Sequence, residues 1–347
     1  MITVNARCTC GPQDSFQATT IERRDPRPND IVIDIAYAGI CHSDVEHARS
    51  IRGKTLYPLV PGHEVAGIVS AVGKSVTRFR VGDRVGVGNM VDSCGICTSC
   101  GAGLEQYCAK RVLAYNAVDL DGERVYGGYS EKTVVDERFV VRIPDAIPLP
   151  KAAPLLCAGI TMYSPLRHWD VRSGMRVGIL GFGGLGHVGV QMASAMGAYT
   201  TVMDLSPAKR ADAMRLGADA YVVASEPQAL DRLKNSLDMI ISTVSLEDLD
   251  PYIELLGLDG TFVNLAIPAE QIRVSGARIL ANRRSIAGTR SGGIAQTQEM
   301  LDFCAMHGIA AEVEIIHADD IDAAYRRLLA GDVRFRFVID NSTLVKA

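Results

Sequence analysis

The sequence predicts an α/β protein with two domains, a β-barrel-like domain and a doubly wound domain built on a parallel sheet. The chain has 347 residues, which exceeds the size at which a single hydrophobic core keeps growing. Roughly the first 145 residues read as short strands separated by glycine and proline. From residue 176 onward, apolar strands alternate with longer helical stretches, a pattern that implies a parallel sheet covered by helices on both faces.

The strands expected in the first domain alternate partly between apolar and polar side chains, as half-buried strands do. Gly73 and the Gly82-Asp83 pair supply turns between them. The expected strands are residues 30–40, 64–73, 82–88, 129–136 and 138–145.

The second domain follows a proline-rich stretch, residues 144–156. A helix over residues 207–216 ends at Gly217, a common helix stop. The expected strands are residues 176–180, 200–204, 220–224, 239–243, 261–265 and 285–289. After residue 290 the order is helix, strand, helix, strand, and a tail this short is expected to rejoin the first domain. The predicted domains are therefore 1–148 with 290–347, and 149–289.

Composition excludes several classes of protein. The net charge of −4 argues against non-specific binding to nucleic acid or to an anionic membrane. No apolar stretch reaches the ~18 residues of a spanning helix, and the N-terminal residues lack the apolar core of a signal peptide. Nine cysteines, an odd number, suit a reducing compartment in which clustered thiols bind metal. We therefore expect a cytoplasmic protein.

The strongest single motif is a cluster of four cysteines within fifteen residues: Cys94, Cys97, Cys100 and Cys108. Four thiolates at this spacing can surround one tetrahedral ion, and zinc suits four sulfur ligands in a closed, structural site. An iron–sulfur cluster is the alternative, although the spacing departs from the usual ferredoxin runs.

A glycine-rich motif, GFGGLG, occupies residues 181–186. It follows the expected strand 176–180 and opens an apolar helix, and Asp204 ends the next strand 18 positions after Gly186. In this context the glycines let a pyrophosphate approach, the helix N-terminus binds it, and the acid binds ribose hydroxyls. We expect a dinucleotide cofactor to contact Gly181, Gly183, Gly184, Leu185, Gly186 and Asp204.

Three further residues are far apart in the sequence: Cys41, His63 and Cys157. One histidine and two cysteines make a three-ligand zinc site with an open fourth position, the type that activates a bound oxygen. His42 is adjacent to Cys41, and adjacent side chains in an extended segment diverge, so His42 is not expected to bind the same ion.

Together these motifs resemble the zinc-dependent medium-chain dehydrogenase/reductases, most closely the cinnamyl-alcohol-dehydrogenase-like branch. The resemblance covers essentially the whole chain through GICHSD, YPLVPGHEVAGIVSAVG, GDRVGVG, VDSCGICTSC, APLLCAGITMYSPLRHW, GFGGLGHVGVQMA and RFRFVID. It implies a GroES-like β-barrel catalytic domain, a Rossmann domain, two zinc ions per chain and NAD(P)(H). Relatives are commonly dimers or tetramers, and we expect a homodimer.

The resemblance also implies roles for individual residues. Cys41, His63 and Cys157 would bind the catalytic zinc, and the four clustered cysteines the structural zinc. Asp44 resembles the acceptor that orients His63, and Ser43 the hydroxyl that takes the proton of the alcohol. The resemblance further implies that Glu64 is a carboxylate that can approach the zinc. It also implies that Thr161 lies beside the nicotinamide ring and that Arg336 lies near the pyrophosphate.

The chain departs from the family in its proton relay. Relatives often carry a histidine five residues after the first zinc-binding cysteine, whereas here Glu46 holds that position and His47 follows it. In a helical turn a shift of one position rotates a side chain by about 100°. Glu46, His47 or water can end the relay, and the sequence leaves the choice open.

The second departure is Asp204, where the closest branch usually has a small hydroxyl residue that leaves room for the 2′-phosphate of NADP. An aspartate repels that phosphate and binds a free 2′-hydroxyl, which favours NAD. Ser206, Lys209 and Arg210 follow closely and can bind a phosphate. The resemblance favours NADP and the aspartate favours NAD; we expect NAD.

The predicted function is that of a zinc-dependent alcohol dehydrogenase or aldehyde reductase, which transfers hydride between a nicotinamide cofactor and a primary, aromatic or allylic alcohol or aldehyde. A polyol or secondary-alcohol dehydrogenase and a reductase of a biosynthetic carbonyl or iminium are the alternatives among enzymes. A non-catalytic nucleotide-binding protein is the alternative outside them, and the complete set of Cys41, His63 and Cys157 argues against it.

Overall fold

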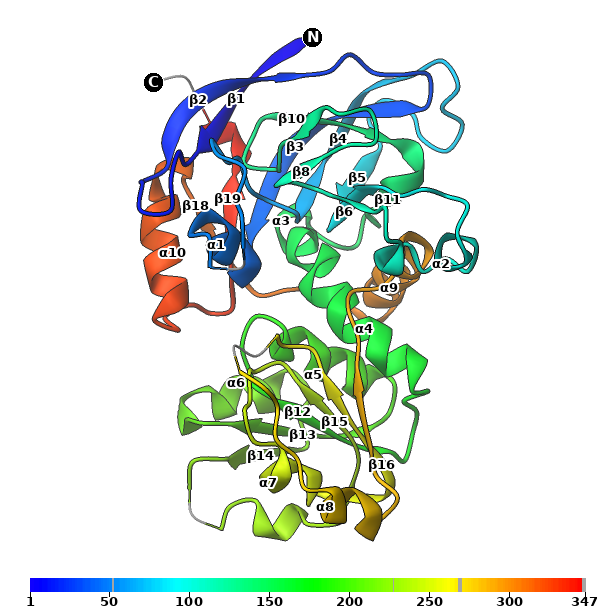
Figure 1. Cartoon of the computed structure of the whole chain (residues 1–347), viewed down its shortest axis with the longest axis vertical. Coiled ribbons are helices and arrows are strands. Elements are labelled where there is room, and N and C mark those ends of the chain that lie inside the picture. The colour runs from blue at the N-terminus through cyan, green and yellow to red at the C-terminus, as the bar shows by residue number, and fades with distance from the viewer. Residues whose placement is uncertain (52, 227, 268–269, 345–347) are drawn as a thin grey trace. The chain divides into compact units, whose positions relative to one another are not determined.

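The computed structural model describes residues 1–51, 53–226, 228–267 and 270–344. The chain forms two compact units, Met1–Ile160 with Gly292–Ala347, and Thr161–Ser291 (Figure 1). The α/β class and both predicted domain types are confirmed. The first unit extends to residue 160 rather than 148, because α3 (Leu149–Ala152) and η3 (Ala153–Leu156) contact its main sheet.

The main sheet of the first unit has the strand order β11-β5-β4-β3-β19-β18, with β10 also paired to β3. Its pairs are antiparallel except β18 with β19. The strands are β3 (Asp30–Ile40), β4 (Val65–Val72), β5 (Arg84–Val87), β10 (Lys132–Asp136), β11 (Val141–Arg142), β18 (Val313–Ile316) and β19 (Arg336–Asp340). The antiparallel pairing of β19 with β3 places the C-terminal segment in the main sheet of the first unit.

The remaining elements of the first unit are short or lie beside this sheet. The strands β1 (Ile2–Cys8) and β2 (Gln17–Arg23) form a separate antiparallel pair, which was not among the predicted strands. The other elements are α1 (His42–Ala48), β6 (Met90–Asp92), α2 (Thr98–Gly101), β7 (Val112–Leu113), β8 (Ala117–Val118), β9 (Arg124–Val125), α9 (Ile294–His307) and α10 (Ile321–Leu329).

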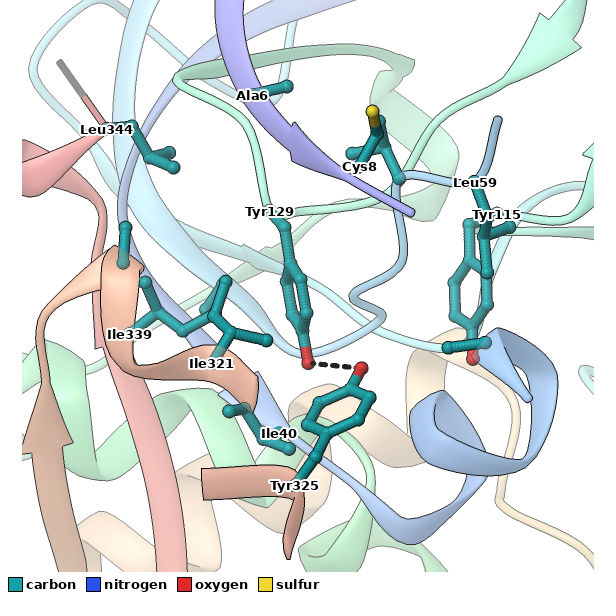
Figure 2. Close-up of a cluster of buried hydrophobic side chains, with 14 of the residues drawn as sticks. Ala6, Cys8, Ile40, Leu59, Tyr115, Tyr129, Ile321, Tyr325, Ile339 and Leu344 are labelled. Carbon is teal, nitrogen blue, oxygen red and sulfur yellow. Dashed lines mark hydrogen bonds between the residues drawn. The ribbon is translucent and has the colours of Figure 1, made fainter. Parts of the chain in front are cut away.

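A buried cluster joins the N-terminal strand, β3, β19 and α10 (Figure 2). Ile40, Ile321 and Ile339 pack there around two tyrosines whose hydroxyls form a hydrogen bond of 3.3 Å, Tyr325 to Tyr129. Apolar burial of this kind contributes about 25 cal/mol per Å² of surface removed from water. The cluster therefore fixes β3, whose C-terminal end leads directly into the candidate site.

The second unit is one parallel sheet of strand order β14-β13-β12-β15-β16-β17. Its strands are β12 (Arg176–Leu180), β13 (Tyr199–Asp204), β14 (Ala220–Val223), β15 (Leu237–Ser242), β16 (Leu256–Asn264) and β17 (Ser285–Gly288). Its α-helices are α5 (Gly186–Ala195), α6 (Arg210–Arg215), α7 (Asp250–Ile253) and α8 (Gly276–Ala281). It also includes α4 (Ala158–His168) from Thr161 onward. The chain order reverses at β12, the place where doubly wound sheets bind ligands.

Candidate active site

Cys41 and Asp44 lie where β3 ends and α1 begins. Cys41 is the N-cap of α1, and Asp44 stands in its first turn. Asp44 Oδ2 accepts a hydrogen bond from the Cys41 backbone N–H at 2.8 Å. A side-chain oxygen that accepts from an otherwise unpaired N–H stabilises a helix start, and here it also fixes the position of the Cys41 thiol.

His63 lies in the loop that precedes β4. Gly62 in this loop has φ +109°, and a Cβ there would lie 2.7 Å from the Tyr129 ring, so only glycine fits. Asp44 Oδ1 accepts from the Gly62 backbone N–H at 3.3 Å and lies 2.9 Å from His63 Nδ1. The buried Asp44 carboxylate therefore holds His63 with Nε2 directed away from it, the orientation that a metal-binding histidine needs.

Cys157 completes a group of side chains that fits a zinc ion. The Cys41 and Cys157 sulfurs are 3.9 Å apart, and His63 Nε2 lies 3.2 Å from Cys157 Sγ. Ligands at usual zinc distances in a tetrahedron are about 3.8 Å apart for two sulfurs and about 3.6 Å for sulfur and nitrogen. The three predicted ligands thus converge on one point, together with Glu64.

Glu64 forms a buried ion pair with Arg336, which comes from β19. Arg336 is 3% exposed and also donates to the Ile40 carbonyl at 3.0 Å. Glu64 Oε1 lies 4.0 Å from His63 Nε2. Burial raises the pKa of Glu64 to about 7, and the charge of Arg336 opposes that rise. Arg336 therefore places a positive charge beside the Glu64 carboxylate, next to Cys41, His63 and Cys157.

The four clustered cysteines form a second group with tetrahedral spacing. Sulfur–sulfur distances are 3.5 Å for Cys97 to Cys100, 3.5 Å for Cys108 to Cys94 and 3.9 Å for Cys94 to Cys100. The backbone N–H groups of Ile96 and Cys97 lower the pKa of Cys94 to about 6, which favours the thiolate form that binds metal. The loop therefore fits a closed zinc site.

A cavity of about 110 Å³ lies beside the three-ligand group and is bounded by residues of the first unit only. Its wall is formed by Ser43, His47, His63, Asn89, Leu113, Ala114 and Tyr115. The Tyr115 hydroxyl donates to the Ser43 carbonyl at 3.3 Å, and its ring lies 5.8 Å from the His63 ring, centroid to centroid. Ser43, predicted to handle the proton, thus shares a cavity with a predicted zinc ligand.

The glycine-rich loop joins β12 to α5 in the second unit. Gly181 has φ +91°, and a Cβ at Gly186 would lie 2.0 Å from the Gly181 carbonyl oxygen, so the fold itself requires both glycines. Gly183 is different, because a Cβ there would meet no atom within 4 Å. A glycine that the fold does not require leaves its backbone open to a ligand, as a pyrophosphate needs.

Asp204 and Lys209 stand beside this loop. Asp204 Oδ2 accepts from the Phe182 backbone N–H at 3.3 Å and Oδ1 from the Leu205 N–H at 2.7 Å. Lys209 Nζ donates to the Phe182 carbonyl at 3.4 Å. The structure thus brings together the predicted loop, the predicted acid and a lysine that can bind phosphate.

Two family descriptions match the chain, "Alcohol dehydrogenase GroES-like domain" over residues 27–145 and "Zinc-binding dehydrogenase" over residues 184–306. NADP-dependent alcohol dehydrogenase C of Mycobacterium bovis is 52% identical over 346 residues, which cover 99% of this chain and 100% of that protein. The chain belongs to the zinc-type medium-chain alcohol dehydrogenases.

Two solved structures of alcohol dehydrogenases resemble the whole chain. A cinnamyl alcohol dehydrogenase from Sorghum bicolor has a TM-score of 0.96 and 38% identity, with full coverage of both chains. CAD from Helicobacter pylori, in complex with NADP(H), has a TM-score of 0.92 and 40% identity over 98% of this chain and 99% of that one. The predicted family and its cinnamyl-alcohol-dehydrogenase-like character are therefore confirmed.

The expectation of NAD is not supported for this alcohol dehydrogenase. The M. bovis relative is named as NADP-dependent, and the H. pylori structure contains NADP(H). The expectation rested on Asp204 repelling a 2′-phosphate and binding a free 2′-hydroxyl, whereas backbone N–H groups already donate to both of its oxygens. The coarser statement, a nicotinamide-dependent alcohol dehydrogenase, stands.

Several features of this alcohol dehydrogenase were not predicted. The Glu64–Arg336 pair joins residues 272 positions apart, and no local pattern signals it. Tyr115 and Asn116 surround His47 but belong to no motif. Thr161 lies on α4, the first residue of the second unit, and its contact with nicotinamide stays a prediction, as does that of Arg336 with pyrophosphate.

Asp44→Asn is expected to lower zinc affinity and activity by about 10- to 100-fold. Asp44 accepts from Cys41 N–H with one oxygen and faces His63 Nδ1 with the other, whereas an asparagine has only one oxygen. One of the two contacts therefore becomes a clash between donors. Zinc titration of the metal-free protein measures the loss. Asp83→Asn, which changes a largely buried carboxylate that pairs with Arg142 and belongs to neither metal group, is the control and should bind zinc normally.

Proposed function

We propose that this alcohol dehydrogenase interconverts aromatic or allylic aldehydes and their primary alcohols with NADP(H). The main observation behind this proposal is that Cys41, His63 and Cys157 converge on one buried point. A cavity lined by Ser43 lies beside that point. The substrate class is supported by the cinnamyl alcohol dehydrogenase structures, which match this chain over nearly its full length. Assembly as a homodimer in the cytoplasm belongs to the same proposal.

The chemistry can be followed through the residues of the chain. When bound by Cys41, His63 and Cys157, zinc supplies Lewis acidity toward an oxygen atom. Asp44 keeps His63 in the metal-binding orientation, and the Glu64–Arg336 pair keeps a compensated charge beside the group. Ser43 lines the cavity, where it can exchange the proton of the hydroxyl group. A nicotinamide cofactor bound by the second unit would supply or accept the hydride.

The cofactor proposed is NADP(H) rather than NAD(H). Each oxygen of Asp204 already accepts from one backbone N–H group, which engages part of its hydrogen-bonding capacity. Lys209 carries its charge beside the same loop, where a phosphate can form charge-assisted hydrogen bonds with it. The balance of groups therefore favours a cofactor with an additional phosphate, in agreement with the names of the relatives.

For cinnamaldehyde reduction, kcat/KM for NADPH is expected to be at least about tenfold higher than kcat/KM for NADH. A hydrogen bond to a charged group contributes about 1.5–3 kcal/mol, which corresponds to about tenfold or more in affinity. The measurement is NADPH or NADH oxidation at equal concentration in zinc-loaded protein. Lys209→Gln should reduce the rate with NADPH and have a smaller effect on the rate with NADH.

An NADH preference would refute the cofactor proposal and restore the ribose role of Asp204. Rapid turnover of sorbitol or 2-propanol with negligible turnover of cinnamaldehyde would refute the substrate class. It would identify the polyol or secondary-alcohol dehydrogenase that the sequence also allows.

A further inference from the structure

His47 is a fixed part of the wall of the Ser43 cavity. It lies four residues after Ser43 on α1, and residues at this spacing share a helix face. Its ring stands edge-on to Tyr115, with centroids 5.4 Å apart. Its backbone carbonyl accepts from Thr55 Oγ1 at 2.7 Å and from the Ser50 N–H at 3.1 Å, which holds the end of the helix.

Asn116 determines which nitrogen of His47 carries the proton. Asn116 Oδ1 accepts from the Leu56 backbone N–H at 2.8 Å, and a backbone N–H can only donate. This contact fixes the amide orientation, so the atom 3.0 Å from His47 Nδ1 is the amide nitrogen of Asn116. An amide nitrogen also only donates, and His47 Nδ1 must therefore accept. The proton of the neutral ring is then on Nε2.

We propose that Asn116 holds His47 as the neutral tautomer protonated on Nε2, so that neither ring nitrogen offers an available lone pair and His47 is not the base of the reaction. The identification of the cavity as the substrate site rests on the proposed function. A base needs an available lone pair, and the lone pair of Nδ1 accepts from Asn116. A proton on Nδ1 would place two donors 3.0 Å apart.

The tautomer can be measured without substrate, so this result is independent of the proposed function. Nitrogen NMR of zinc-loaded protein with 15N-labelled histidine reports the protonation of each ring nitrogen, and His47→Gln assigns the His47 signals among the seven histidines. At pH 7 we expect an unprotonated Nδ1 and a protonated Nε2. A ring protonated on Nδ1, or on both nitrogens, would overturn the proposal.

Asn116→Asp is the matched variant for the role of Asn116. Aspartate has the same size, tolerates the left-handed backbone of this position (φ +52°) and keeps an oxygen for Leu56 N–H. Its second oxygen accepts where the amide donated, so His47 should gain a proton on Nδ1. An unchanged His47 spectrum in this variant would show that Asn116 does not set the tautomer.

Kinetics test whether His47 is the base. With cinnamaldehyde and NADPH, His47→Leu is expected to keep kcat within about tenfold of the wild-type value, because no base is removed. His47→Gln, which also lacks a titratable nitrogen, should give a similar kcat. A decrease of about 10²- to 10⁴-fold in kcat in both variants is the signature of a lost general base and would contradict the proposal.

Discussion

Cys41→Ser should lower kcat for aldehyde reduction by about 10³-fold or more, since a metal Lewis acid supplies several kcal/mol of stabilisation to the transition state. Cys41 is one of three ligands that converge beside the Ser43 cavity, and its backbone is held by Asp44 through a contact that does not involve the thiol. The exchange of sulfur for oxygen therefore removes a ligand while it preserves the local backbone. Steady-state rates with NADPH and cinnamaldehyde measure the loss.

The matched control for this variant is Cys304→Ser. Cys304 is also a buried cysteine, but its sulfur contacts Met300 on α9 and belongs to neither metal group. Its kcat should stay within a few-fold of the wild-type value. A similar kcat for Cys41→Ser and the wild-type protein would mean that the three-ligand group is not where the reaction occurs.

Arg336→Met is expected to lower the free energy of unfolding by about 3–5 kcal/mol, the usual cost of leaving one member of a buried ion pair uncompensated. Glu64 is fully buried, and Arg336 is its ionic partner. Chemical denaturation of the zinc-loaded protein measures the loss. The double variant Glu64→Gln/Arg336→Met should recover part of it, because no unpaired charge then remains.

An exposed pair provides the comparison for this prediction. Arg283 and Asp259 form an ion pair with side chains 76% and 53% exposed, and Arg283→Met should leave the free energy of unfolding nearly unchanged. The sequence instead predicted that Arg336 contacts the pyrophosphate of the cofactor. A stable Arg336→Met variant with a raised KM for NADPH would support that role and contradict a mainly structural one.

Local pattern was sufficient to predict most of the fold. The predicted strands 30–40 and 176–180 agree with β3 and β12 because both are apolar runs bounded by turns or helix starts. The short polar strand β2 was missed, since it lacks the alternation on which such predictions depend. The end of the first unit was placed too early because helical packing on a sheet, here by η3, is not visible in sequence.

Much of the candidate site was predictable from short motifs and from the family resemblance. The clustered cysteines and the glycine loop each occupy one segment, so their spacing and the elements that flank the glycines indicated what they are expected to bind. The dispersed Cys41, His63 and Cys157 were assigned as a set through the resemblance. The pairing of Glu64 with Arg336 and the contact of Asn116 with His47 arise from tertiary packing, which brings distant residues together. The expectation of NAD, which the relatives named for NADP(H) do not support, was drawn from the residue type at position 204, and the backbone partners of Asp204 are not apparent from the sequence.

The most direct test of a catalytic metal site is the zinc content of the wild-type protein and of the variants Cys41→Ser and Cys108→Ser, measured by inductively coupled plasma mass spectrometry. The two groups of ligands predict two zinc ions per chain in the wild type and one in each variant. Loss of the zinc ion in Cys41→Ser should abolish aldehyde reduction directly, whereas the zinc ion lost in Cys108→Ser should have no direct part in the reaction. Full activity in wild-type protein free of zinc, or two ions bound to Cys41→Ser, would contradict the assignment.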